Sequence, residues 1–425
     1  MRLIQNFDAL ATSQERKICL ELIEAALSSI QPEHVIQKTI SLNNDTLSIQ
    51  DTQLNLNEFE RIFLIGFGKG SASLSRQIEN LIGNFLTEGY VIDLKPENFS
   101  KIELTLGAHP LPSKENFLFT KKVVERLKNL TEKDLVLIVI AGGGSALFVN
   151  PYKVSLEKLI EANKMLLKSG ATISEMNVVR KHLSLVKGGG LAKLLYPAQI
   201  VSIIASDVPG NDLSVIASGP TVKDTTTKGD AFDILKRYNL WEKLNLSIEE
   251  LLETPKEDMY FRNISNILIL SNQTALEAME QKAVEAGYKT LIESYKLQGD
   301  AKTVGKMLID KTPTKTILLA GGETTLKVEG KGQGGRNQEL VLNALPTIPN
   351  DITIASFDSD GWDNSPHAGA IADITTLEKA KSLNLILEEF LQNNNTFPFF
   401  QKVGDGIITN RLPSNVSDLM IVIKK

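Results

Sequence analysis

Six short apolar runs, each ended by a turn rich in glycine, serine or aspartate, constrain the fold of this sequence most strongly. The clearest, Leu135 to Ile140, has no polar residue, as is typical of a strand buried on both faces of a parallel sheet. Helical patterns separate several of the runs. We therefore predict an α/β protein of two domains with mostly parallel, Rossmann-like sheets and an interdomain cleft. The runs occupy residues 61–65, 135–140, 199–205, 267–270, 317–319 and 352–355.

The boundary between the two domains is predicted near residue 240. A chain of 425 residues is long enough for two hydrophobic cores. Asp224 to Lys228 resembles a linker, and the residues after it are polar with a helical pattern. We expect an N-terminal Rossmann-like α/β domain over residues 1–240 and a C-terminal α/β domain over residues 241–425.

Composition excludes several classes of function. A net charge of −5 and a pI near 5.7 argue against a nucleic-acid footprint or a polybasic membrane patch. The single cysteine, Cys19, excludes internal disulfides and thiolate metal clusters, and four scattered histidines argue against a zinc site. The sequence has no signal-peptide pattern and no apolar run near the roughly 20 residues of a membrane span. We expect a soluble cytoplasmic protein that binds small molecules, and leave open whether it is a homodimer.

The turn after the first run, residues 66–72 with the sequence GFGKGSA, predicts a phosphate site. Gly66 and Gly68 allow backbone N–H groups to approach an anion at a helix N-terminus, and Lys69 adds a mobile positive charge. The turn is no P-loop, because Phe63 stands where the first glycine is required. It also lacks the last glycine of a dinucleotide fingerprint. Asp93 could still bind a ribose, so a dinucleotide site stays an alternative.

The turn after the second run places Gly142, Gly143 and Gly144 before Ser145. Three glycines make a nest of N–H groups suited to a carboxylate or a phosphate. The helix predicted over residues 174–195 carries Asn177, Arg180, Lys181, His182 and Lys187. We interpret Arg180 and Lys181 as a solvated basic face.

Two pairs of aspartates suggest metal or proton chemistry. Asp207 and Asp212 flank a Pro-Gly turn, where they could hold a hydrated Mg²⁺, or one could take a proton while the other orients it. Asp360 and Asp363 flank Gly361 at a spacing that resembles oxygen ligands, although the stretch is not an EF-hand loop.

Residues 320–339 contain two more glycine turns, which we expect to bracket a short hairpin. The first holds Gly321, Gly322 and Glu323, and the second delivers Arg336 and Asn337. A fixed guanidinium can clamp a phosphate or carboxylate through two hydrogen bonds. Because ligands of open α/β sheets bind at the carboxyl ends of strands, these turns together favour phosphoryl transfer, where catalysis consists mostly of positioning and charge neutralisation.

The sequence resembles the glycerate 2-kinases, a two-domain family with a C-terminal MOFRL domain, over roughly residues 10 to 425. Members phosphorylate the 2-hydroxyl of D-glycerate from ATP with a divalent cation such as Mg²⁺, and many were formerly labelled hydroxypyruvate reductases. The matching motifs are GFGKGSA, AGGGSAL, MNVVRKHLS followed by KGG, SDVPGNDLSVIASGPT, AGGETTLKVEGKGQGGRNQE and SDGWDNSPHAGAIAD.

The resemblance implies a site in this chain. Catalysis is expected from Lys69, Arg336 and Asp207, and metal binding from Asp207 and Asp360. The residues expected to bind the cofactor ATP are Gly66, Gly68, Gly143, Gly144, Ser145, Asp212, Gly321, Gly322, Glu323 and Asn337.

Three departures from the family pattern leave the lysine and the arginine untouched. Gly190 stands where arginine or glutamine often follows KGG, Asn364 replaces a glycine, and TNRLPSNVSD replaces a glycine-rich turn near the C-terminus. Two alternatives to the kinase are an NAD(P)H-dependent hydroxypyruvate reductase and a non-catalytic metabolite sensor.

Overall fold

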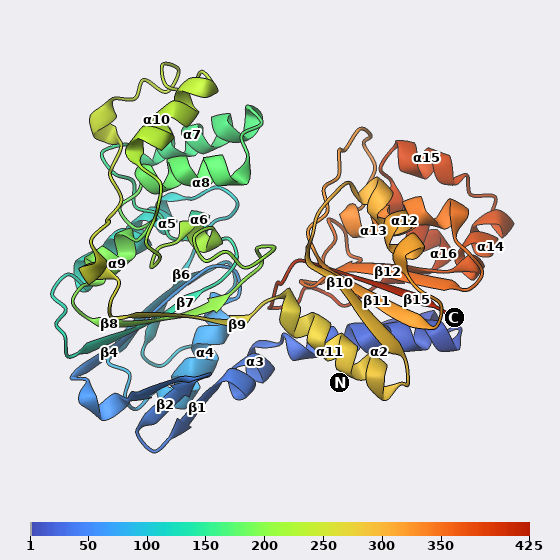
Figure 1. Ribbon diagram of the computed structural model, residues 1–425, viewed down its shortest axis with the longest axis horizontal. Coiled ribbons are helices and arrows are strands. Elements are labelled where there is room, and N and C mark those ends of the chain that lie inside the picture. The colour runs from blue at the N-terminus through green and yellow to red at the C-terminus, as the bar shows by residue number, and fades with distance from the viewer. Residues whose placement is uncertain (1) are drawn as a thin grey trace. The chain divides into compact units, whose positions relative to one another are not determined.

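The computed structural model describes residues 2–425 and divides the chain into two compact units (Figure 1). The N-terminal unit comprises residues 35–206 and 211–269. The C-terminal unit comprises the residues up to His34, residues 207–210 and residues 270–425. This division differs from the predicted boundary after residue 240, because strand β9 (Ile264–Leu270) still belongs to the first sheet and the N-terminal segment belongs to the second unit.

The N-terminal unit is built on a six-stranded sheet with the order β6-β5-β4-β7-β8-β9. The pairs from β6 to β8 are parallel, as predicted. Every residue of the central strand β7 is buried, which explains the uninterrupted apolar run from Leu135 to Ile140, and Asp134 at its start pairs with Arg61. The strands are β4 (Arg61–Phe67), β5 (Glu88–Asp93), β6 (Ile102–Leu106), β7 (Asp134–Ile140) and β8 (Gln199–Ala205), and a separate antiparallel sheet holds β1 (Ile40–Asn43), β2 (Thr46–Ile49) and β3 (Thr52–Asn55).

Figure 1 shows α7, α8 and α10 gathered together, apart from α4. The helix α4 (Ser71–Ile82) and α5 (Lys114–Arg126) pack on the sheet. The others include α7, α8 and α10, whose apolar side chains share a second core. The helices that follow α5 are α6 (Gly144–Leu147), α7 (Leu156–Lys168), α8 (Ile173–His182), α9 (Gly190–Leu195) and α10 (Lys228–Arg237), and α3 (Pro32–Thr39) spans the division between the two units. The single helix predicted over residues 174–195 is therefore two helices, separated at the glycines that follow Lys187.

The C-terminal unit contains a mixed six-stranded sheet, so the prediction of mostly parallel pairing is wrong for this unit. Its order is β10-β11-β15-β12-β13-β14. Of the strands described in this sheet, only β10 and β11 pair in parallel. The last strand, β15, runs antiparallel to both of its neighbours. The apolar pattern of a strand does not reveal whether its neighbours run parallel or antiparallel to it, so the sequence could not show this pairing. The strands are β10 (Lys289–Leu297), β11 (Thr316–Gly322), β12 (Ile352–Asp358), β13 (Gly369–Ala372), β14 (Gly406–Ile407) and β15 (Asp418–Lys424).

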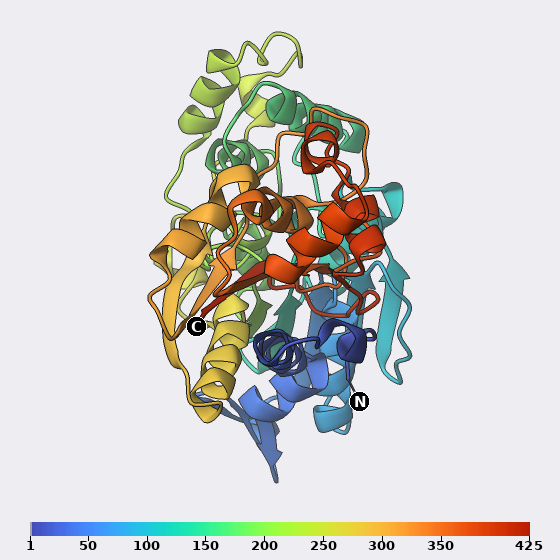
Figure 2. The same ribbon diagram turned by 90° about the vertical axis from the view of Figure 1, so that its right-hand side faces the viewer.

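The N-terminal helix α2 (Gln14–Ser29) is part of this C-terminal unit. It lies against α11 (Asn272–Glu285), and Figures 1 and 2 both show the two helices side by side. The fully buried Arg16 of α2 pairs with Asp373 and Asp405, at 2.7 and 2.9 Å. The remaining helices are α1 (Phe7–Leu10), α12 (Ala301–Lys311), α13 (Arg336–Ala344), α14 (Ile374–Ser382), α15 (Leu387–Gln392) and α16 (Thr396–Val403).

Within residues 2–425, none of the helices combines the length and the apolar character that crossing a membrane requires.

Candidate functional site

The turns after β4 and β7 lie side by side at the carboxyl ends of these neighbouring strands. The backbone N–H of Lys69 donates to the carbonyl of Gly142 at 2.7 Å, and that of Ala141 donates to Phe67 at 3.0 Å. Gly68 has a φ of +118°, and a Cβ there would lie 2.3 Å from the carbonyl oxygen of Ala141. Only glycine fits so close an approach of two backbones. The structure thus brings the predicted Lys69 turn and the glycine turn together.

Lys69 extends along the glycine turn beside His109. A Cβ on Gly143 would lie 2.8 Å from Cδ2 of His109 and 3.6 Å from Cε of Lys69. Burial and, to a lesser extent, the nearby charge of Lys69 together lower the pKa of His109 to about 4. His109 is therefore neutral at pH 7, so Lys69 is the cation that this surface presents to an anion.

Asp93 occupies the helix end that the sequence offered to a ribose or phosphate. It is 3% exposed, and its carboxylate accepts the N–H of Ala72 at 2.9 Å and that of Leu94 at 2.6 Å. Burial raises its pKa, and these backbone hydrogen bonds lower it less. Because an internal carboxylate already caps α4, the support for a dinucleotide site is weakened.

Several of the predicted glycines are explained by packing. A Cβ on Gly66 would lie 2.7 Å from Oγ of Ser75 in α4, and one on Gly322 would lie 2.1 Å from the carbonyl oxygen of Leu297. A Cβ on Gly321 would lie 2.9 Å from the amide nitrogen of Asn272. These glycines allow helices and strands to pack closely. A ligand contact at any of them stays a prediction.

Ser145 opens a chain of hydroxyl groups beneath the glycine turn. Its Oγ lies 2.9 Å from Oγ of Ser218, which donates to Oδ1 of Asn177 at 3.0 Å. Gly144 packs here too, since its Cβ would lie 2.9 Å from that of Ala217. The loops after β7 and β8 and the helix α8 therefore meet at Ser145.

The two aspartates of the SDVPGND stretch fall in different units. Asp207 is half-buried and lies in the segment 207–210 of the C-terminal unit, whereas Asp212 belongs to the N-terminal unit. Asp212 is exposed, and its Oδ1 accepts the N–H of Ser214 at 2.9 Å. It thereby stabilises the turn that leads to Ser218. A direct role in catalysis or ligand binding stays a prediction for both aspartates.

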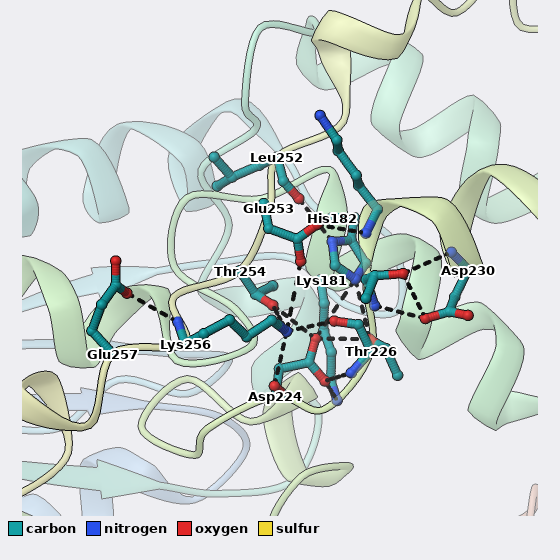
Figure 3. A network of polar contacts seen from close by, with 12 residues as sticks. Lys181, His182, Asp224, Thr226, Asp230, Leu252, Glu253, Thr254, Lys256 and Glu257 are labelled. Carbon is teal, nitrogen blue, oxygen red and sulfur yellow. Dashed lines mark hydrogen bonds and ion pairs between the residues drawn. The ribbon is translucent and has the colours of Figure 1, made fainter.

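The solvated basic face predicted on α8 is wrong for Lys181, and the neighbouring His182 is buried as well. Figure 3 shows both side chains in a polar network around Asp224. Lys181 is 6% exposed and its Nζ lies 3.0 Å from Oδ1 of Asp224; His182 lies 3.1 Å from Thr226 and 2.7 Å from the carbonyl of Leu252. Burial would raise the pKa of Asp224, but its bonds to Lys181 and Thr226 hold it below the usual value. This network anchors the segment that the sequence suggested as a linker.

In the C-terminal unit, Arg336 joins the ends of three strands. It begins α13, and its Nε lies 2.7 Å from Asp418 while Nη1 lies 2.5 Å from Glu323. Its Nη2 donates to Asp418 at 3.1 Å and lies 3.9 Å from Asp358. The side chain is 28% exposed. The guanidinium is thus held in place by carboxylates and still accessible to a ligand.

Carboxylate groups outnumber the single guanidinium around Arg336. Burial and the charges of Asp360 and Asp418 raise the pKa of Asp358 well above its usual value. Burial also raises the pKa of Asp418 to about 6, against the opposing effect of Arg336. Asp360 is half-buried, and its Oδ1 accepts the N–H of Trp362 at 2.9 Å. An additional cation would relieve the mutual repulsion of these groups.

Asn337 and Asp363 have positioning roles in this arrangement. The fully buried Asn337 donates to Asp418 at 2.8 Å. Asp363 accepts the N–H groups of Asn337 and Gln338, at 3.1 and 2.9 Å, and so caps α13. The spacing that suggested an oxygen ligand at Asp363 therefore reflects a helix cap. Sequence reasoning missed Asp418, whose only signal was its place directly before the last apolar run.

The hairpin predicted between the two glycine turns is absent from residues 323–335. These residues form an irregular loop whose N–H groups at Lys331 and Gln333 donate to the side chains of Asn393 and Asn395, each at 3.0 Å. The loop is held by a distant segment, which a local pattern could not reveal.

No group of three or more histidine, cysteine, aspartate or glutamate side chains is arranged as a metal site in the described part of the chain. A magnesium ion carried by a nucleotide needs only one or two protein carboxylates in addition to phosphate and water oxygens. The carboxylates of Asp358, Asp360 and Asp418 fit that smaller requirement.

His367 provides a test of the pH dependence of stability. It is 5% exposed and packs on Phe397 and Gly406, so it is a packing residue, and burial lowers its pKa to about 4. The unfolded chain takes up a proton below about pH 6.5 and the folded unit does not, so stability falls as the pH drops from about 6.5 to 4. We expect this group to remove about 2 kcal/mol between pH 7.5 and pH 5.

The measurement is urea unfolding at both pH values in a Trp241→Phe background. Trp241 lies in the N-terminal unit, so Trp362 alone then reports on the C-terminal unit. His367→Phe should shrink the difference between the two pH values, whereas His34→Gln, at an exposed position, should leave it unchanged. An unchanged difference in His367→Phe would contradict the assignment.

Comparison with known proteins places this arrangement in a family. The model of a domain of unknown function, DUF4147, matches residues 18–253, and that of the MOFRL family matches residues 316–418. A glycerate 2-kinase from Pyrococcus horikoshii is 36% identical over 436 residues, which cover 96% of this chain and 97% of the relative. A protein from Agrobacterium vitis, provisionally named a hydroxypyruvate reductase, is 34% identical and covers 85% of this chain and 87% of itself.

A solved structure agrees with the sequence relatives. The crystal structure of a glycerate kinase from Thermotoga maritima superposes with a TM-score of 0.85 at 30% identity, covering 96% of this chain and 99% of that one. The similarity includes both units and spans nearly the whole of both chains. The chain therefore belongs to the glycerate kinase family, with a DUF4147 N-terminal region and a MOFRL C-terminal region.

Proposed function

We propose that this protein is a glycerate 2-kinase, which transfers the γ-phosphoryl group of ATP to the 2-hydroxyl of D-glycerate and releases 2-phosphoglycerate. The observation that carries the proposal is the alignment of a glycerate 2-kinase with nearly the entire chain, so that the Lys69 turn and the Arg336 helix both lie within the aligned length. The geometry around Lys69 and around Arg336 is consistent with it, since phosphoryl transfer needs fixed cations more than covalent chemistry.

Two cations have distinct proposed roles. Lys69, next to the neutral His109, neutralises charge on the phosphates, and the turns at Gly68 and Gly143 direct backbone N–H groups toward them. Arg336 stabilises charge that develops on the transferring group, where a preorganised donor is most effective. Asn337 holds Asp418 against this arginine. Asp207 is proposed as the base for the hydroxyl group or as a metal ligand.

Mg²⁺ is the proposed metal, and Asp207 and Asp360 would hold it. Bound with the nucleotide, it would neutralise the phosphates and fix their orientation. The excess of carboxylate near Arg336 fits a site that takes up a divalent cation.

Phosphorus NMR of a reaction with D-glycerate, ATP and Mg²⁺ tests the proposal directly. The expected product is 2-phosphoglycerate, whose resonance differs from that of 3-phosphoglycerate. A product phosphorylated at the 3-hydroxyl, or no product at high enzyme concentration, would reject it. Omission of Mg²⁺ in a parallel sample tests the metal.

Reduction of hydroxypyruvate by NAD(P)H is the second candidate, since one relative carries that provisional name. The capping role of Asp93 weighs against it. Incubation with hydroxypyruvate and NADH decides the question, because a reductase would oxidise NADH and so lower its absorbance.

We further propose a cytoplasmic enzyme, and light scattering would decide whether it is a homodimer.

A further inference from the structure

Two cations in the N-terminal unit have no role in the kinase scheme so far. Arg180 lies on α8, and its Nε donates to Oδ1 of Asn163 at 2.6 Å. Lys187 follows the same helix, and its Nζ donates to the carbonyl oxygens of Ser145 and Phe148, at 2.7 and 3.2 Å. All three acceptors are neutral oxygens. These contacts orient the two cations without neutralising their charge.

Burial removes Lys187 from water and shields Arg180 in part. Lys187 is 3% exposed and Arg180 is half-buried. Burial and, to a lesser extent, the positive charge of Arg180 together lower the pKa of Lys187 to about 7, which indicates that the two charges are near each other. Burial lowers the pKa of Arg180 as well. Two like charges kept from water are unfavourable unless an anion shares their surroundings.

The helix α8 presents Arg180 and the side chains around it to different neighbours. Asn177 lies one turn before Arg180 on the same side of the helix, and it accepts a hydrogen bond from Ser218, whose Oγ adjoins that of Ser145. Lys181 and His182, in contrast, belong to the network around Asp224 (Figure 3). The polar network thus fixes the helix, and Asn177, one turn before Arg180, joins it to the glycine turn through Ser218 and Ser145.

The backbone beside these groups is strained. Ala217 and Ser218 have φ values of +50° and +61°, in the left-handed region that non-glycine residues seldom occupy. The carbonyl of Ser218 accepts the N–H of Gly188 at 2.9 Å, and that of Gly219 accepts the N–H of Gly189 at 2.8 Å. Strain of this kind persists where the surrounding contacts fix a site. Here it ties the segment after Lys187 to the hydroxyl chain.

We propose that Arg180 binds the carboxylate of the hydroxy-acid substrate, and that Lys187, held under the turn by Ser145 and Phe148, adds a second positive charge to that site. The inference rests on the proposed function, in which the substrate is a small acid whose one charge is its carboxylate. A guanidinium matches a carboxylate through two parallel hydrogen bonds, which a neutral side chain cannot replace. The glycine turn connects this site with Lys69, because the carbonyl of Gly142 accepts the N–H of Lys69.

Kinetics of Arg180 variants give the first test. Arg180→Met should raise the KM for D-glycerate by about 100-fold and change the KM for ATP by less than about 3-fold. Arg180→Lys keeps the charge and loses the planar fork, so its KM for D-glycerate should lie between those of wild type and Arg180→Met. Arg126→Met, at an exposed position on α5, is the matched control and should behave as wild type. Glyceramide, the neutral amide of the substrate, should be a much poorer substrate than glycerate for wild type alone.

Isothermal titration with D-glycerate, in the presence of a non-hydrolysable ATP analogue, separates this inference from the kinase proposal. Binding to wild type together with its loss in Arg180→Met supports the carboxylate site whether or not phosphate is transferred. Equal binding by both proteins, no binding by wild type, or an unchanged KM in the variant would overturn it. Failure of wild type to phosphorylate glycerate that it binds would reject only the kinase. If Arg180→Met does not fold, Arg180→Lys is measured in its place.

Discussion

Arg336→Lys is expected to lower kcat for glycerate phosphorylation by about 10²–10³-fold, with a smaller effect on either KM. The guanidinium uses Nε and Nη2 on Asp418 and Nη1 on Glu323. A lysine ammonium cannot reproduce these three contacts and present a donor to the ligand as well. The charge would remain, but it would no longer be fixed where the transferring phosphoryl group needs it.

Steady-state kinetics with both substrates varied would measure this effect, and thermal unfolding would show that the variant is folded. The matched control is Arg2→Lys in the same unit, where an exposed arginine pairs with Asp8. It should retain wild-type turnover. A kcat close to that of wild type in Arg336→Lys would remove this residue from the mechanism.

Arg16→Met is expected to destabilise the C-terminal unit by about 3–5 kcal/mol. The arginine is fully buried, and its loss would leave Asp373 and Asp405 in the interior without their cation. Thr376 would also lose the hydrogen bond that it accepts from Nη2. Removal of one partner from a buried ion pair is more destabilising than replacement of the whole pair by apolar groups.

Urea unfolding in the Trp241→Phe background measures this change through Trp362. Arg2→Met is the matched control, because its ion pair with Asp8 is exposed, and we expect it to change stability by less than about 1 kcal/mol. A similar small change in Arg16→Met would mean that the buried carboxylates are neutralised by protonation at little cost. In that case the difference in unfolding free energy between wild type and Arg16→Met should be smaller at pH 5 than at pH 7.5.

The sequence was most informative where a strand leads directly into a helix. The helix N-terminus predicted at the turn of residues 66–72 is that of α4, and the runs at 61–65 and 135–140 lie in the neighbouring strands β4 and β7. Periodicity and capping residues act locally, so they are readable from one chain. Strand direction depends on partners far along the sequence, which is why the position of β15 between β11 and β12 was not foreseen.

The candidate site was predictable only in part, for a related reason. Lys69 and Arg336 stand out because glycine turns surround them, and glycine is needed where backbones approach closely. Asp418 carries no such sign, and Arg180 was interpreted as a surface residue because helical spacing does not reveal what the helix packs against. The burial of these two residues determines their roles, and burial is a property of the completed fold.

The position of α2 has a consequence for the synthesis of the chain. Its apolar residues and Arg16 find their partners in α11 and in Asp373 and Asp405, which leave the ribosome long after α2 itself. Until translation passes α11, which ends at Glu285, the apolar residues of this helix lack their main cover, and until it passes Asp405 the cation lacks one of its two carboxylates; the N-terminal unit is completed before either. A chaperone that shields the nascent N-terminus would therefore raise the yield of folded protein, and a fragment that begins at residue 270 would lack one side of its own core.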